Sequence, residues 1–330
     1  MGVFVAVAVF AIFMSRRLGA QGKQMFAALG GPQGSAAIQA ATKGDLGPYR
    51  HLIQTTADRD ARAFLADEVG RRARVDAVAA WVSAEPNSTD AQLTWGASLI
   101  AQAWEARGGG TSVSPAARQA FHEHLVQADA ALQHAAAGRP DDATPWALRI
   151  VCARGLGGGR ALVDGLFAEA TARDPESWLA HIEMLRYLTP KWHGSDEAML
   201  GFARGVRDRA PQGSDLHTLI LAAHLERWIG LELIQGSRKQ AARYVANPAV
   251  QLECTTAYDN GLGSSSLRSR LSTQAARNYA GAWFHLAKDK PRLRAEVMAI
   301  GNAFTESPWN AFAPTAEAGF RRASKWAFGV

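Results

Sequence analysis

Prolines divide much of this chain into segments of similar length, and their spacing limits the folds open to it. Proline lacks a backbone N–H and clashes with the preceding turn, so it ends a helix. A short polar stretch and a new helical pattern follow each one, and the last two intervals are 35 and 36 residues. This repetition predicts helix hairpins that stack on their neighbours to bury their apolar faces. The prolines are Pro86, Pro140, Pro175 and Pro211.

The rest of the folded body supports the same fold class. No segment after Asp45 has the alternating pattern of a half-buried strand, whereas apolar residues recur at helical spacing. Hydrophobic residues make up 48% of the chain and charged residues 20%, a balance that excludes general disorder. We therefore expect an all-α protein, an α-solenoid of stacked helix hairpins preceded by an N-terminal apolar helix.

One stretch resembles the tetratricopeptide repeat family. In "FAEATARDPESW" an aromatic residue, Phe167, is followed three positions later by Ala170 and five further on by Pro175, the spacing found in the second helix of that repeat. Trp146 and Trp178 resemble the tryptophan of its first helix, and we expect both to be largely buried. The resemblance extends over about residues 140–230, although Gly205 replaces the alanine in "FARGVRDRAP". It implies a small alanine that lets two helices approach, and a protein-binding role without chemistry.

The N-terminus predicts membrane attachment. Residues 2–14, "GVFVAVAVFAIFM", carry no charge, and Arg16 and Arg17 follow almost at once. A cleaved signal peptide has its positive charge before the apolar stretch, so this order favours an uncleaved anchor over residues 1–18. The positive-inside rule then places the folded domain in the cytoplasm. Thirteen residues span about 20 Å, less than the hydrocarbon core, so a buried terminal helix or an incorrectly chosen start codon are alternatives.

Residues 19–44 are rich in Gly, Ala, Gln and Ser and have no sustained apolar stripe. This composition predicts a flexible tether. The helical-repeat domain is then expected over residues 45–330.

The stretch "LTPKWHGSDEAML", residues 188–200, lies midway between two of the spaced prolines, where a hairpin makes its internal turn. Gly194 permits the chain to reverse, and Ser195 is a natural N-cap for the helix that follows. Trp192 and His193 exceed what the reversal needs. We expect a structural corner in which Trp192 packs on neighbouring helices, and we retain Trp192 and His193 as candidate partner contacts.

Other polar residues do not form a recognisable catalytic or metal site. His122 and His124 are two apart on a helix and point in different directions, while His217 and His224 are about 10 Å apart along the axis, so we expect solvated or capping histidines. "GLGGGR" at residues 155–160 lacks the features of a phosphate loop, and "GLGSSSL" at 261–267 is not a nucleophile elbow. Cys254 lacks a basic neighbour in sequence and is expected to be an inert buried thiol. No catalytic residue, cofactor or metal is predicted.

Charge and composition narrow the class of partner. The chain has 36 basic and 30 acidic residues, but they are interspersed, which does not favour nucleic acid. Arginine outnumbers lysine 29 to 7, a bias that we associate with a bacterial genome. We therefore expect a non-catalytic scaffold that binds a protein or peptide at the cytoplasmic face of a bacterial membrane. The alternative is an all-α hydrolase or transferase whose site is assembled from several helices.

Overall fold

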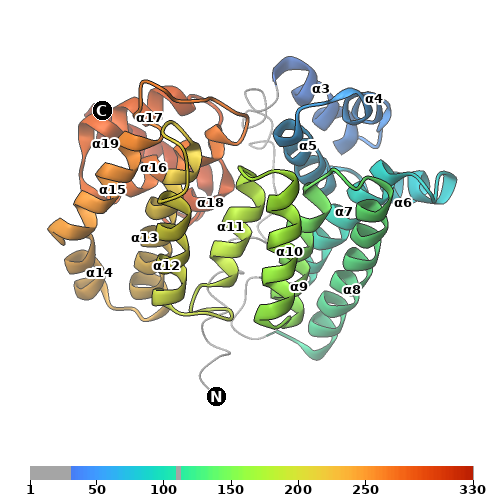
Figure 1. The fold of residues 1–330 in the computed structure, drawn as a ribbon, viewed down its shortest axis with the longest axis horizontal. Helices are drawn as coiled ribbons and strands as arrows, with labels where there is room; N and C mark the ends of the chain where they lie inside the picture. Colours follow the sequence, from blue (N-terminus) through green and yellow to red (C-terminus); the bar gives the residue numbers. More distant parts are fainter. Residues whose placement is uncertain (1–30, 109–112, 330) are drawn as a thin grey trace. The chain divides into compact units, whose positions relative to one another are not determined.

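The computed structural model describes residues 31–108 and 113–329, and every regular element in these ranges is a helix (Figure 1). The all-α prediction is confirmed for them. The described residues form two compact units, divided between Tyr187 and Leu188. We call residues 31–187 the N-terminal unit and residues 188–329 the C-terminal unit, so the domain expected over 45–330 is divided at this point. The expected anchor, residues 1–18, lies outside the described residues.

The N-terminal unit contains nine of the described helices. They are α3 (Gly31–Thr42), α4 (Gly47–Thr55), α5 (Arg59–Arg72), α6 (Val75–Ala84), α7 (Thr89–Arg107), α8 (Pro115–Gly138), α9 (Thr144–Leu156), α10 (Arg160–Arg173) and α11 (Trp178–Tyr187). Consecutive long helices pack on one another, α5 on α7, α7 on α8, α8 on α9 and α9 on α10.

Helix α3 occupies much of the stretch for which a flexible tether was predicted. It packs on α4 and α5, and Ala37, Ile38 and Ala41 are at most 1% exposed. The Gly- and Ala-rich composition serves here to let helices approach closely rather than to keep the chain flexible. Packed structure therefore includes residues 31–42 and does not begin near Asp45.

The four spaced prolines all lie in breaks between helices, as predicted. The polar residues after them cap the helices that follow. The Ser88 hydroxyl accepts a hydrogen bond from the Ala91 amide at the start of α7, and Asp142 accepts one from the Thr144 amide at 2.8 Å at the start of α9. These bonds satisfy backbone donors that have no partner inside the helix.

Helices α9, α10 and α11 pack around three small residues. Ala147, Ala170 and Ala180 are fully buried together, and Phe167 packs against them. Trp178 is 6% exposed, which confirms the burial predicted for it. The small side chains let the three helices approach closely.

The tryptophan at the matching place, Trp146, is only half-buried, contrary to the expectation that it would be largely buried. Two guanidinium groups lie over its ring, Arg149 at 5.3 Å and Arg173 at 4.8 Å from the ring centroid. Cation–π attraction of this kind stabilises an aromatic ring near the surface.

A buried ion cluster connects separate helices of the N-terminal unit. The Arg62 guanidinium on α5 donates to Asp142 at 2.6 Å, to Asp90 of α7 at 2.5 Å and to the carbonyl oxygen of Ile53 at 2.8 Å. Arg62 and both aspartates are at most 7% exposed. Because the charges are paired and hydrogen-bonded, their burial is tolerated, and removing one partner would leave a buried charge uncompensated.

The C-terminal unit contains ten described helical elements. They are α12 (Asp196–Arg207), the 3₁₀ turn η1 (Asp215–Thr218), α13 (Leu219–Ile229), the π turn η2 (Gly230–Ile234), α14 (Arg238–Val245), α15 (Pro248–Asn260), α16 (Thr273–Ala287), α17 (Lys290–Ile300), α18 (Glu306–Trp309) and α19 (Ala316–Phe328). Its core includes the fully buried Trp283 and Trp309, and Trp309 donates its indole N–H to Asn278 at 2.6 Å.

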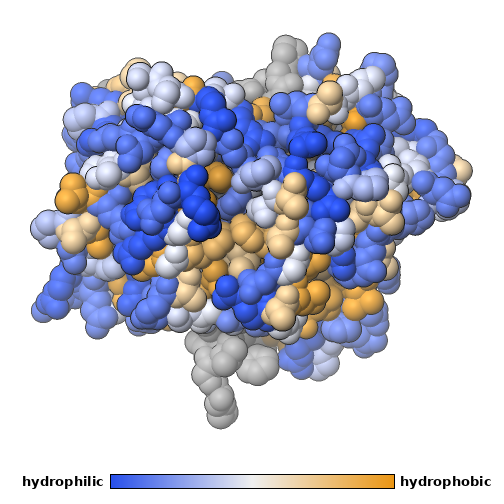
Figure 2. Space-filling view, viewed as in Figure 1, coloured by the Kyte–Doolittle hydropathy of each residue, from blue (hydrophilic) through white to orange (hydrophobic). Residues whose placement is uncertain are grey.

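The face drawn in Figure 2 is mainly hydrophilic, and its hydrophobic residues lie in separate patches. In the described chain the large hydrophobic side chains that are exposed are few: Val75, Val126, Leu162, Leu252, Met298 and Phe328. The last three belong to the C-terminal unit.

Candidate functional site

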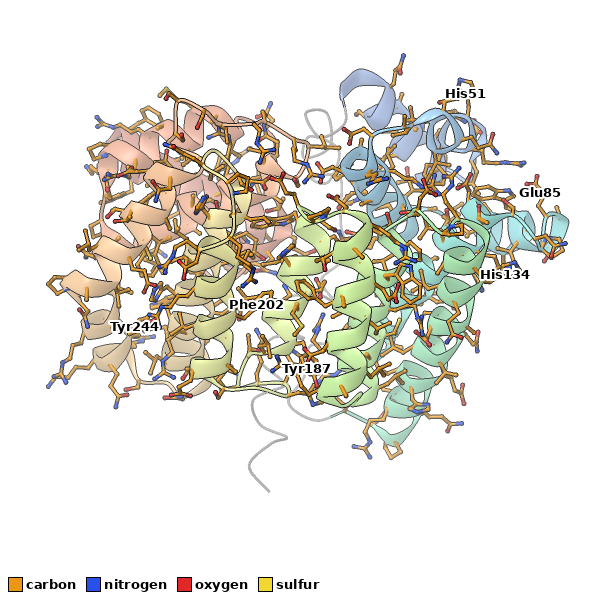
Figure 3. All side chains as sticks on the ribbon, in the orientation of Figure 1. His51, Glu85, His134, Tyr187, Phe202 and Tyr244 are labelled. Carbon is orange, nitrogen blue, oxygen red and sulfur yellow. The ribbon has the colours of Figure 1, made fainter. Side chains whose placement is uncertain are left out.

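A polar network joins four helices of the C-terminal unit. His224 on α13 is 1% exposed. Its Nδ1 lies 2.5 Å from the hydroxyl of Tyr244 on α14, and its Nε2 lies 3.2 Å from a carboxylate oxygen of Glu253 on α15. Figure 3 labels Tyr244 on the α14 side of this unit. The histidine therefore connects a tyrosine to a glutamate.

Two arginines of α12 fix the glutamate from the other side. Arg204 donates to both carboxylate oxygens of Glu253, at 2.7 and 2.8 Å, and Arg207 donates to one of them at 3.1 Å. The hydrogen bonds from Arg204, together with the charge of Arg204 and the hydrogen bond from His224, outweigh burial and lower the pKa of Glu253 to about 2. Glu253 is thus an ionised acceptor at neutral pH.

These contacts set the direction of the hydrogen bonds. Because ionised Glu253 only accepts, the His224 Nε2 carries the proton and donates it, and Nδ1 then accepts from the Tyr244 hydroxyl. Burial lowers the pKa of His224 and raises the pKa of Tyr244, so both side chains are neutral. The chain of donors runs from Tyr244 through His224 to Glu253.

An open hollow lies beside this network. Its volume is about 410 Å³, and it is lined by residues of α12, η1 and α15 and by the residue that follows α12: Arg207, Asp208, His217, Ala249, Leu252, Glu253, Thr256 and Asn260. Leu252 is 67% exposed. The hollow therefore combines an exposed apolar side chain with an arginine and a glutamate that are held in place by each other.

His217 also lines the hollow, and it was expected to be solvated or capping. It is 5% exposed, and its Nε2 lies 3.2 Å from the carbonyl oxygen of Pro211. Burial lowers its pKa, so Nε2 donates and Nδ1 is left as an acceptor that has no hydrogen-bond partner within the described residues. His224 is also buried, so neither histidine is solvated, which was one of the two roles expected for them. Residues 213–226 are buried without interruption, so η1 and most of α13 lie inside the unit.

The corner at residues 188–195 has the turn chemistry that was predicted. The Ser195 hydroxyl accepts from the Ala198 amide and caps α12, and a Cβ on Gly194 would approach the Leu188 carbonyl oxygen to 2.1 Å, so only glycine fits. Trp192 is half-buried, His193 is exposed, and neither lines the hollow. Trp192 and His193, the candidate contacts from the sequence, therefore lie outside the lining of the hollow on α12 and α15.

The corner is fastened to α13 by ion pairs. Lys191 Nζ lies 2.6 Å from a carboxylate oxygen of Glu226, and these side chains are 4% and 6% exposed. Arg227 also pairs with Asp196 at the start of α12. These bonds hold the loop that carries Trp192 in one position.

The remaining sequence motifs have structural roles. Gly157, in the left-handed conformation, and Gly159 end α9 and begin α10, and residues 261–267 form turns between α15 and α16. Cys152 and Cys254 are buried and not in a disulfide, and burial raises the pKa of both thiols, which confirms the prediction of an inert Cys254. No cluster of three or more acidic, histidine or cysteine side chains suited to a metal ion occurs in the part of the chain that the structure describes.

Comparisons with known proteins give no assignment. No protein-family model, no curated protein and no solved structure matches this chain. Within residues 31–108 and 113–329, none of the helices combines the length and apolarity needed to cross a bilayer.

Proposed function

We propose that this protein is a non-catalytic scaffold that binds a protein or peptide partner at the hollow on α12 and α15. The observation that carries this proposal is the combination of exposed Leu252 with the Arg207–Glu253 pair in one hollow. Burying the apolar area of a leucine on association is favourable, whereas the fixed ion pair has already lost its conformational freedom before binding. Arginine is enriched at protein interfaces, where apolar side chains are removed from water.

The packing of the N-terminal unit supports a tetratricopeptide-like solenoid as the architecture. Phe167 and Ala170 occupy the positions that the resemblance implies, and Ala170 lies at the contact between α9, α10 and α11. In such a solenoid the first helices of the hairpins line the binding groove. Here no residue of α9 or α11 is exposed. We therefore assign partner binding to the hollow of the C-terminal unit and not to those helices.

The proposal keeps the bacterial cytoplasmic membrane as the location. It rests on the apolar residues 2–14 and on Arg16 and Arg17, which follow them. With this anchor, the scaffold would hold its partner at the cytoplasmic membrane surface.

The second candidate is an all-α hydrolase or transferase, and the Tyr244–His224–Glu253 chain is the observation that favours it. A base oriented by a carboxylate next to a hydroxyl is the arrangement that activates a nucleophile. The pKa values of Glu253 and Tyr244 do not favour acid–base catalysis by this chain. Acid–base catalysis works best with a pKa near the working pH, whereas the pKa of Glu253 is lowered to about 2 and that of Tyr244 is raised by burial. Burial raises the pKa of Asp67 to about 6, which is closer to neutral pH. Asp67, however, lies on α5 of the N-terminal unit in an ion pair with Arg71, and it does not belong to the Tyr244–His224–Glu253 chain.

Photo-crosslinking tests the binding proposal. A benzoylphenylalanine at position 252 should capture one specific protein from membranes, while the same group at Leu162, a leucine 51% exposed on α10, should not. Filling the hollow with Thr256→Arg should abolish capture, and Gln240→Arg, at an exposed position of α14, should leave it intact. Identical products from positions 252 and 162, or capture that survives Thr256→Arg, would remove the hollow as the binding site.

A reactive probe separates the enzyme alternative. A nucleophilic tyrosine is labelled by an aryl sulfonyl fluoride at pH 7, and the labelling requires its base. We expect Tyr244 to be labelled no faster than Tyr279, whose hydroxyl lies 3.4 Å from the hydroxyl of Ser307. Rapid labelling of Tyr244 that is lost in His224→Gln would favour the hydrolase or transferase.

A further inference from the structure

The C-terminal helices α17 and α19 lie side by side in the C-terminal unit (Figure 1) and carry an exposed basic surface. Six cationic side chains on or next to these helices are exposed: Lys288, Lys290, Arg294, Arg321, Arg322 and Lys325. Of these, Arg321 is paired with Glu317. Among the described residues, Lys288, Lys290, Arg322 and Lys325 have no carboxylate within ion-pair distance. We name the six residues and the aromatic side chains among them the basic–aromatic surface.

Aromatic side chains lie directly among these charges. The ammonium groups of Lys288 and Lys290 lie 5.1 and 5.0 Å from the ring centroid of half-buried Trp326. Arg294 donates to the carbonyl oxygen of Ala327 at 2.6 Å, and its guanidinium lies 5.9 Å from the ring of Phe328. The cations of α17 are thus held against the rings of α19.

Exposed apolar groups complete the surface. Phe328 is 45% exposed, and Met298, one helical turn after Arg294 on α17, is 68% exposed. Large hydrophobic side chains in water beside unpaired cations are costly for a surface that faces only solvent. They are the composition of a helix that lies in a lipid interface, with apolar groups and tryptophan at the acyl boundary and lysines and arginines at the headgroups.

A half-buried histidine lies in the positive potential at this place. His285 on α16 contacts the Trp326 ring edge-on, at 5.6 Å between centroids. Burial and the charges of Lys288 and Arg322 lower the pKa of His285 to about 4. Lys288 and Arg322 are 34 positions apart in the sequence, and the charges of both lower the pKa of the same side chain.

We propose that the basic–aromatic surface of α17 and α19 docks on an anionic lipid bilayer, as a membrane contact in addition to the N-terminal segment. Its ligand is the phosphate-bearing headgroup of an acidic phospholipid. The two ammonium groups cover the face of Trp326, so the ring is not open to stack on a nucleic-acid base as single-strand binding requires. The exposed Met298 and Phe328 would gain from the acyl boundary and would gain little from a duplex.

Hydrogen exchange of the full-length chain in nanodiscs tests this proposal. We expect amides of residues 288–298 and 316–329 to exchange more slowly on nanodiscs of phosphatidylcholine with phosphatidylglycerol than on phosphatidylcholine alone. The difference should disappear at 0.5 M salt, since exposed charges are screened. A basic residue near an anionic surface contributes roughly fivefold to partitioning onto that surface. The triple variant Lys290→Glu, Arg322→Glu and Lys325→Glu should therefore weaken the partitioning of α17 and α19 onto the anionic lipid on the order of a hundredfold.

A matched control keeps the net charge change equal. Lys43→Glu with Lys239→Glu and Arg243→Glu alters three exposed cations elsewhere and should leave the protection of α17 and α19 unchanged. Retention on neutral nanodiscs reports the N-terminal anchor alone, so failure of the anchor is distinguishable from failure of this surface. Equal exchange on both lipids would overturn the proposal. So would binding of a duplex oligonucleotide that is lost in the first triple variant while lipid composition has no effect.

Discussion

The hydroxyl of Tyr244 donates to Nδ1 of His224 across 2.5 Å, and this bond joins α14 to the buried helix α13. Because His224 is 1% exposed, removing the hydroxyl leaves a buried acceptor without its donor. Tyr244→Phe should therefore lower the free energy of unfolding by about 1–3 kcal/mol, measured by urea denaturation. Tyr187→Phe, which removes a bond to the Gly158 carbonyl oxygen in the N-terminal unit, is a matched comparison (Figure 3). An unchanged unfolding midpoint for Tyr244→Phe would show that the hydrogen bond adds nothing to stability.

Acid should destabilise the C-terminal unit in two ranges of pH. The pKa of His224 is lowered from 6.5, so its neutral form stabilises the fold at pH 7, and that contribution declines as pH falls below about 6.5. The pKa of Glu253 is lowered from 4.5 to about 2, so its contribution is complete above 4.5 and is lost as pH falls toward 2. Urea midpoints across pH 7 to 2.5 measure both. Glu253→Gln should be less stable at pH 7 and should lack the decline specific to the range below 4.5. A decline of the same size in that variant would exclude Glu253 as its source.

Close packing around Ala170 should not tolerate a larger side chain. Ala170→Leu places three more carbon atoms at the contact of α9, α10 and α11, and overpacking of this kind costs about 1–3 kcal/mol. Ala168→Leu, two positions earlier on the exposed side of α10, is the control and should be near neutral. Thermal unfolding of both variants decides the matter, and equal melting temperatures would mean that the helices do not approach at Ala170.

The corner should behave as a structural element. Trp192→Ala should lower the free energy of unfolding by about 1–3 kcal/mol, less than for a fully buried tryptophan because Trp192 is half-buried. His193→Ala should change it by less than about 0.5 kcal/mol, since this side chain is exposed. If instead both variants melt like the parent chain and both lose the partner captured at position 252, then Trp192 and His193 are binding residues.

Membrane attachment through residues 1–18 is tested by fractionation. The intact chain should sediment with membranes and require detergent for release, because residues 2–14 are apolar and Arg16 and Arg17 follow. A chain that lacks residues 1–18 should be released on washing with 0.5 M salt, which screens the remaining contact of α17 and α19. A full-length chain that stays in solution without detergent would contradict the anchor.

Features set by neighbouring residues could be predicted from the sequence. The prolines mark breaks between helices, and Ser195 caps α12, because each effect acts within one turn of the chain. The network around His224 could not be predicted in this way. Its partners Tyr244 and Glu253 are 20 and 29 positions away on other helices, and no local spacing brings them together. Only the packing of α13 against α14 and α15 makes the site.

Composition was misleading where small residues had two uses. Ala37 and Ala41 gave residues 31–42 the appearance of a tether, yet small side chains also permit helices to touch. Whether small residues form a flexible tether or a close helix contact depends on whether other helices pack against the segment. Trp146 is a similar case, since its sequence position matched that of buried Trp178 while its surroundings supplied Arg149 and Arg173 instead of a full apolar cover.

The buried ion pair between Lys191 and Glu226 limits where a fragment of the C-terminal unit can begin. It ties the first residues after the division at Tyr187 and Leu188 to α13, inside the same unit. A fragment that starts at Leu188 keeps the ion pair that holds its new N-terminus on α13. A fragment that starts at Trp192 lacks Lys191 and leaves the Glu226 carboxylate buried without a counter-charge. One lysine that lies outside any helix therefore limits where a fragment of the C-terminal unit can start, and fragment expression should begin before it.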